Sequence, residues 1–276
     1  MRVARFGTRL YLALDASAVA AAALGEGLGG RRARGFARVP LEPGALVPSP
    51  SGPSLARGDE VRGAVRRALE GLGGGRVTLV LPDGLARIAL FDLPRGAEPR
   101  DYVRFRLAAS LPWPASETIV DCLPAAHGRV VGAAVRRSTV AEYEEAAAAT
   151  GLEIERVHIA PLLALEGLVR SGAREAVHAV LGDVALCLAT FHEGALVALR
   201  NRRRDRSRGE ASRLREEVGR AAHAGNGTGP ARLVVSGADA TRLRREVGGE
   251  LAEQGLEGPG EWDDAVEAAW LGGLLS

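Results

Sequence analysis

Short strand-like runs alternate with helical patterns along most of this sequence. Thr8–Leu14 and Arg76–Leu81 are rich in β-branched and other apolar residues, whereas Glu60–Leu72 carries apolar residues at the i, i+3 and i+4 spacing of a helix. Such mixing predicts an α/β or α+β fold with mixed sheets. The length of 276 residues suggests one large or two medium domains, with enough chain for a sizeable core.

The same alternation continues through the middle of the chain. Strands are predicted at Arg34–Val39, Leu85–Leu93, Thr118–Leu123, Arg129–Val135 and Ile154–Ile159. Helices are predicted at 100–110, 139–151, 161–170, 210–224, 238–254 and 262–275. We expect the helix that starts at Thr139 to be opened by a capping box, in which Thr139 and Glu142 satisfy each other's backbone N–H groups.

Two tight turns mark the second half of the chain. Gly182-Asp183 and His192-Glu193-Gly194 separate three apolar runs, which is typical of consecutive β-hairpins. The apolar stretch near 176–199 contains these charged and polar residues, so it is not a membrane span. We expect a soluble cytoplasmic protein.

Composition excludes several kinds of chemistry. All 36 basic residues are arginine, which rules out a P-loop lysine, a Schiff-base lysine and a kinase-type lysine. The formal net charge of +2 argues against wholesale nucleic-acid binding. Five histidines without metal-ligand spacing and two cysteines predict neither a metal centre nor a disulfide framework. No catalytic set emerges from the sequence.

Leu111-Pro112-Trp113-Pro114 is a candidate binding element. A tryptophan between two prolines has little backbone entropy left to lose, which suits the docking of an extended peptide. The alternative is that Trp113 fills a core next to the preceding helix, since tryptophan is usually well buried. Both interpretations remain open at the sequence level.

The run Arg200–Arg208 is a candidate anionic-surface site. Its guanidinium groups, chiefly those of Arg202, Arg203, Arg204 and Arg206, could bind the phosphates of lipid or nucleic acid. No aromatic residues are interleaved for base stacking. We expect a solvated loop here, with anionic lipid as the next interpretation.

Three segments in order resemble the type IV pilus assembly protein PilM family, an actin-like family related to FtsA. They are VTLVLPDGLARIALFDLP, FRLAASLPWPASETIVDC and VVGAAVRRSTVAEYEEAAAATGLEIERVHIAPLLAL, which together span about residues 76–168. The resemblance implies a two-lobed actin-like (ribonuclease H-like) fold. Its domains would be 1–82 completed by 157–172, an inserted α+β (SHS2-like) domain at 83–156, and a reduced second lobe at 173–276.

The resemblance also implies a function. Members of the family are cytoplasmic scaffolds that bind the short tail of the inner-membrane protein PilN, and their role is similar to that of the cytoplasmic part of type II secretion GspL. Other pilus or secretion platform proteins are further implied partners, and membrane association would be peripheral, through the partner. The tail groove would lie beside the inserted domain, near Phe105, Leu111, Trp113 and the strand Arg76–Leu81.

A divergent actin-like ATPase is the alternative. Of the family's nucleotide elements, the first would fall on Asp15 and Ser17, the second on Gly182 with its acid displaced to Asp183, and the third on Gly237. Most of the expected small or acidic residues around them are missing. About ten residues, 200–209, join the last hairpin to the next helix, too few for the subdomain that clamps adenine. We therefore expect no catalysis and no cofactor, with ATP and Mg²⁺ only under this alternative.

Overall fold

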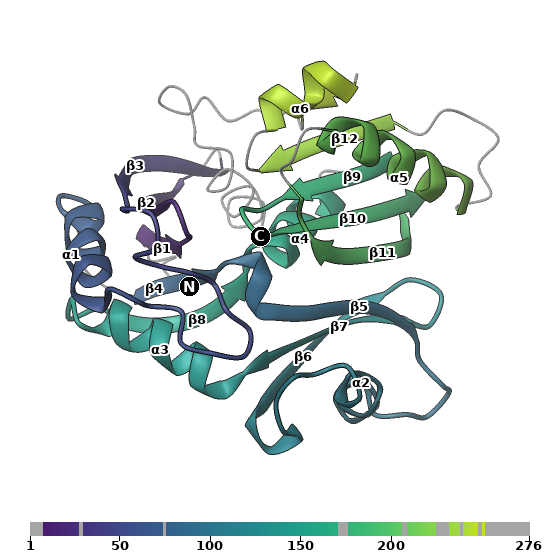
Figure 1. Cartoon of the computed structure of the whole chain (residues 1–276), viewed down its shortest axis with the longest axis horizontal. Coiled ribbons are helices and arrows are strands. Elements are labelled where there is room, and N and C mark those ends of the chain that lie inside the picture. The colour runs from purple at the N-terminus through teal and green to yellow at the C-terminus, as the bar shows by residue number, and fades with distance from the viewer. Residues whose placement is uncertain are drawn as a thin grey trace, which may run out of the picture.

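The computed structural model describes residues 8–27, 30–73, 76–170, 176–205, 209–224, 232–237, 240–247 and 250–251. The predicted helix at 262–275 and the candidate Arg206 lie outside these residues. The described part of the chain contains two five-stranded sheets and one three-stranded sheet, with helices packed against them (Figure 1). We call the parts built on them the first lobe, the second lobe and the inserted domain.

The first lobe is built on the sheet β3-β2-β1-β4-β8. Its strands are β1 (Thr8–Leu14), β2 (Ala18–Gly27), β3 (Gly30–Pro40), β4 (Arg76–Leu81) and β8 (Glu153–Ile159). The first three pair antiparallel, and β4 runs parallel to both β1 and β8. Strand β4 is thus interior, and all its residues after Arg76 are buried.

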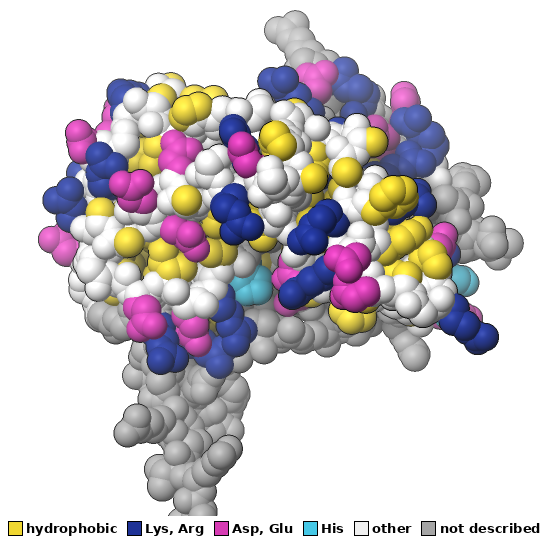
Figure 2. Space-filling model, turned by 90° about the horizontal axis from the view of Figure 1, so that it is seen from below, with side chains coloured by type: hydrophobic (Ala, Val, Ile, Leu, Met, Phe, Trp, Pro, Cys, Tyr) yellow, Lys and Arg dark blue, Asp and Glu magenta, His cyan; other side chains and the backbone are white. Residues whose placement is uncertain are grey.

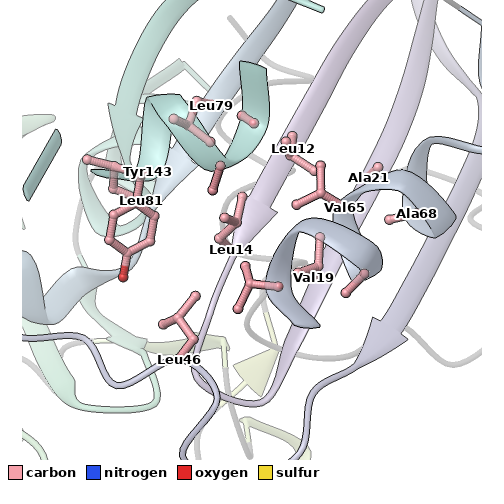
Figure 3. Close-up of a cluster of buried hydrophobic side chains, with 14 of the residues drawn as sticks. Leu12, Leu14, Val19, Ala21, Leu46, Val65, Ala68, Leu79, Leu81 and Tyr143 are labelled. Carbon is pink, nitrogen blue, oxygen red and sulfur yellow. The ribbon is translucent and has the colours of Figure 1, made fainter. Parts of the chain in front are cut away.

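Helices cover both faces of this sheet. Helices α1 (Gly58–Leu69) and α3 (Arg137–Ala148) enclose the larger core, where Figure 3 shows Leu12, Leu14 and Leu79 of the sheet beside Val65 of α1 and Tyr143 of α3. Helix α4 (Ala160–Arg170) places Leu163 against the opposite face. Burial of these apolar side chains is what stabilises the lobe.

The predicted capping box at the start of α3 is wrong. The helix begins directly after a strand, at Arg137, and its N-cap residue Arg136 makes no side-chain cap. Thr139 is therefore inside the helix. The Glu142 carboxylate instead accepts hydrogen bonds from the backbone N–H groups of Ser54 (2.9 Å) and Leu55 (2.8 Å). It ties α3 to the loop that precedes α1.

The inserted domain is a three-stranded antiparallel sheet, β5-β7-β6, with one helix. Its elements are a 3₁₀ turn η1 (Asp83–Leu85), β5 (Ala86–Asp92), α2 (Pro99–Ala108), a 3₁₀ turn η2 (Ala115–Glu117), β6 (Thr118–Ala125) and β7 (Arg129–Arg136). Successive side chains of a strand point to opposite faces. Val130 and Ala134 accordingly pack beneath α2, whereas Val131 and Ala133 face α4 and the second lobe.

The second lobe is built on the sheet β11-β10-β9-β12-β13. Its elements are β9 (Ala176–Leu181), β10 (Ala185–His192), β11 (Ala195–Arg203), α5 (Glu210–Ala224), β12 (Arg232–Gly237), α6 (Ala240–Val247) and β13 (Glu250–Leu251). Both predicted hairpin turns are confirmed by the antiparallel pairing of β9, β10 and β11. The helix predicted to reach residue 254 was too long, because β13 follows α6. Among the described residues, no helix has the length and apolar character of a membrane span.

Candidate functional site

An apolar groove with a volume of about 520 Å³ lies between the inserted domain, α4 and the second lobe. Its lining comprises residues 123–126 and Val131 of the inserted domain, Leu162, Leu165 and Glu166 of α4, and Phe191 and 194–196 of the β10–β11 hairpin. The inserted sheet contributes the face that turns away from α2. Both lobes therefore supply walls of one groove.

The chemistry of the groove suits an apolar chain segment. Glu166 is the one ionisable residue in its lining, and the other lining side chains are apolar or absent. Grooves of this size and character bind ligands chiefly by removing apolar surface from water. No titratable pair in the lining offers acid–base or nucleophilic chemistry.

The groove residues expected from sequence lie elsewhere. Phe105 is 76% exposed on α2, which covers the other face of the inserted sheet. Trp113 is only 7% exposed, and its Nε1–H donates a hydrogen bond to Thr118 Oγ1 at 3.1 Å. Leu111 packs with the core beneath α2, while Pro112 and Pro114 are exposed. None of these five residues lines the 520 Å³ groove.

A second feature is the junction between the two lobes, where a turn of each lobe fits into the other. Asp83, which follows β4, is 5% exposed, and its Oδ2 accepts a hydrogen bond at 3.1 Å from the backbone N–H of Ala185 in the second lobe. A Cβ added to Gly182 would overlap the Asp83 carboxyl group. A Cβ added to Gly84 would likewise overlap Val184. The junction is therefore closely packed.

Buried polar contacts hold the second-lobe side of this junction. Arg204 donates to the carbonyl oxygen of Gly182 at 2.7 Å and forms an ion pair with Glu210. Glu210 also pairs with Arg242 of α6 at 2.8 Å. Desolvation raises the pKa of Asp83 to about 7, and the neighbouring Asp183 carboxylate adds to the shift.

The other sequence candidates for a nucleotide site lie in turns and at a strand end. Asp15 Oδ1 accepts a hydrogen bond from the N–H of Ala16 at 2.7 Å, and the exposed Ser17 uses its carbonyl oxygen for the N–H of Leu41. Gly237 ends β12 and pairs with Leu181, so the structure brings it beside Gly182. Asp183 lies in the β9–β10 turn, half-buried.

The predicted solvated arginine loop is wrong for residues 200–203, which belong to β11. Arg202 forms an ion pair with Glu217 at 2.8 Å, and the Arg204 side chain is buried. Arg203 is exposed. Figure 2 shows basic and acidic side chains intermixed over most of the face that it presents. The described residues of the run thus do not form a continuous basic surface.

No group of three or more His, Cys, Asp or Glu side chains among the described residues could hold a metal ion.

Residues 204–209 alone connect β11 to α5, which confirms that this connection is too short for a packed subdomain.

Comparison with known proteins identifies the fold. No family model and no curated protein matches the sequence. Among solved structures, the PilM-PilN type IV pilus biogenesis complex is similar at a TM-score of 0.69 and 18% identity, covering 88% of this chain and 87% of that one. The cytoplasmic domain of EpsL, an inner-membrane component of the type II secretion system of Vibrio cholerae, is similar at a TM-score of 0.57 and 11% identity. The match covers 98% of this chain and 96% of that one.

A Bacteroides thetaiotaomicron protein with an actin-like ATPase fold and unknown function is also similar. Its TM-score is 0.52 at 10% identity, and 88% of this chain and 90% of that chain are covered. The chain therefore has the actin-like fold that the sequence resemblance implied.

The actin-like fold implies a nucleotide between the lobes, and the residues at the second-lobe turn do not fit one. The N–H of Ala185 is used by Asp83, and the Asp83 carboxyl fills the space in front of Gly182. Burial raises the pKa of Asp83 to about 7, because desolvation disfavours the charged form of its carboxyl group. A phosphate here would meet a turn that the Asp83 carboxyl group already occupies.

Proposed function

We propose that this chain is a non-enzymatic scaffold of a type IV pilus or type II secretion-like assembly platform. In this proposal it binds a short cytoplasmic segment of a PilN-like inner-membrane partner. The similarity in fold to PilM and to the EpsL domain supports the choice of machine. The protein itself is cytoplasmic, and the partner's membrane anchor holds it at the inner membrane.

The observation that carries the proposal is the apolar groove shared by both lobes. An extended segment with apolar side chains would bury them against Leu123, Leu162 and Leu196. Burial of one such side chain contributes about 1.5–3 kcal/mol, so several anchors together are needed to offset the entropy cost of association. The lining offers no nucleophile or acid–base pair, which favours capture of a partner over catalysis.

The proposal is tested by titrating the full chain with a synthetic PilN-type cytoplasmic tail. Ala126 lines the groove yet is exposed, so Ala126→Trp fills the groove mouth without disturbing a core. We expect this variant to weaken binding at least tenfold, because one anchor is lost. Isothermal titration calorimetry gives the dissociation constants.

The matched control is Phe105→Ala. Phe105 is the exposed aromatic of α2 and lies outside the groove, so this variant should bind like the parent protein. Loss of binding in Phe105→Ala with full binding in Ala126→Trp would move the partner site to the α2 face. Absence of any binding by the parent protein would count against the proposed function itself.

A further inference from the structure

Asp83 is an unusual residue for its position. It belongs to the first lobe's chain, directly after β4 and Pro82, yet its carboxyl group reaches into the β9–β10 turn of the second lobe. Oδ2 accepts the Ala185 N–H, whereas Oδ1 is buried and has no hydrogen-bond partner among the described residues. A buried carboxylate with one oxygen unsatisfied is costly, and a neutral carboxyl group is much less so.

The steric fit around Asp83 is tight from both directions. Gly182 of the second lobe has no room for a side chain because the Asp83 carboxyl lies against it. Val184, at the tip of the same turn, lies against Gly84 of the first lobe in the same way. Separation of the two turns would break both of these contacts.

The titratable groups that face Asp83 come from three elements of the second lobe. Asp183 of the turn disfavours a carboxylate, Arg204 after β11 favours one, and the buried Cys187 thiol of β10 is close enough for Asp83 to raise its pKa further. The guanidinium of Arg204 is already committed to Glu210 and to the Gly182 carbonyl oxygen. Desolvation, with Asp183 adding to it, outweighs the hydrogen bond from Ala185 and the charge of Arg204, and so raises the pKa of Asp83 to about 7.

We propose that Asp83 is a proton-linked latch between the lobes. Its neutral carboxyl group holds the β9–β10 turn against the first lobe, and loss of its proton to solvent weakens that hold.

The direction of the pH dependence follows from linkage. The pKa of Asp83 is about 7 in the latched state, against an ordinary value of 3.8 when the carboxyl is solvated. The latch is therefore at full strength below pH 3.8. It weakens by about tenfold for each pH unit up to pH 7 and stays constant above that.

The latch bears on the groove because both lobes line it. Phe191 and 194–196 belong to the lobe that Asp83 holds, and 123–126 belong to the other side. Release of the latch would change the separation of these walls, so a proton would regulate the binding of an apolar segment. This consequence rests on the proposed function, whereas the latch itself does not.

The test is the hydrogen-exchange protection of the Ala185 amide, measured by NMR on the full ¹⁵N-labelled chain between pH 5 and 8 and corrected for the intrinsic exchange rate. We expect the protection factor to fall about tenfold per pH unit from pH 5 to 7 and then to level off. In Asp83→Asn, whose neutral amide replaces the neutral carboxyl, the protection factor should not change with pH.

Asp59→Asn is the matched control, because it makes the same change at a fully exposed carboxylate; it should retain the parent's pH dependence. Equal protection of Ala185 in the parent protein at pH 5 and pH 8, or an unchanged fall in Asp83→Asn, would overturn the proposal. If Asp83→Asn does not fold, ¹³C NMR titration of the Asp83 carboxyl in the parent decides: a midpoint near 7 supports the latch, and one below 5 refutes it. No partner is needed for these measurements, so their failure is distinct from failure of the proposed function.

Discussion

Gly182 tolerates no side chain, because the space that a Cβ would need is filled by the Asp83 carboxyl group. We expect Gly182→Ala to lower the free energy of unfolding by about 1–3 kcal/mol, the usual cost of overpacking a buried site. Urea denaturation measures the change. The lobe junction would have to shift to accept even one methyl group.

Gly219→Ala is the matched control for this substitution. Gly219 lies inside α5 with nothing within 4 Å of an added Cβ, so alanine should raise the free energy of unfolding by about 0.5–1 kcal/mol through its better helix propensity. Equal effects of the two glycine substitutions would mean that the junction is not packed as described.

The contact that Asp83 makes with the second lobe could not be predicted from the sequence. Pro82-Asp83-Gly84 is an ordinary turn sequence, and an aspartate there is normally explained by local turn hydrogen bonds. Its actual partner, Ala185, is 102 residues away in sequence. No pattern in one sequence identifies a contact of that kind, because tertiary packing alone creates it.

The Glu142 side chain of α3 ties this helix to the loop that precedes α1. The Glu142 carboxylate accepts hydrogen bonds from the backbone N–H groups of Ser54 and Leu55, and these bonds anchor the proline-rich loop before α1. We expect Glu142→Ala to lower the free energy of unfolding by about 1.5–3 kcal/mol, since buried donors would be left unpaired. The exposed Glu145 on the same helix is the control, and its alanine variant should stay within about 0.5 kcal/mol. A neutral Glu142→Ala in thermal or urea unfolding would refute the anchor.

Periodicity predicted the strands and hairpins well but missed β2. That strand begins with a run of alanines, which have no β preference of their own, and it is a strand because small side chains fit beneath helices on both faces of the sheet. The groove predicted near Phe105 and Trp113 is not the 520 Å³ groove, which lies on the other face of the inserted sheet. The adjacent apolar residues Val130 and Val131 indicate that both faces of the inserted sheet are covered by other elements. The sequence does not indicate on which of the two faces a groove remains.

Over the whole molecule, the two lobes meet at a junction filled by the protein itself and share a groove that is apolar. The short connection at 204–209 and the occupied turn at Gly182 both disfavour a nucleotide. The groove favours a chain segment. The resemblance to PilM predicted the actin-like fold from about residues 76–168, because the order of those segments is specific even where each is weak alone.

Thermal unfolding of the full chain with each ligand in turn is the most direct test of this account. A PilN-type tail at about 100 times its dissociation constant should stabilise the native state by about 2.7 kcal/mol, which corresponds to a rise in Tm of about 5–10 °C. Millimolar Mg-ATP should leave the Tm unchanged. A rise in Tm with Mg-ATP and none with the tail would contradict the account.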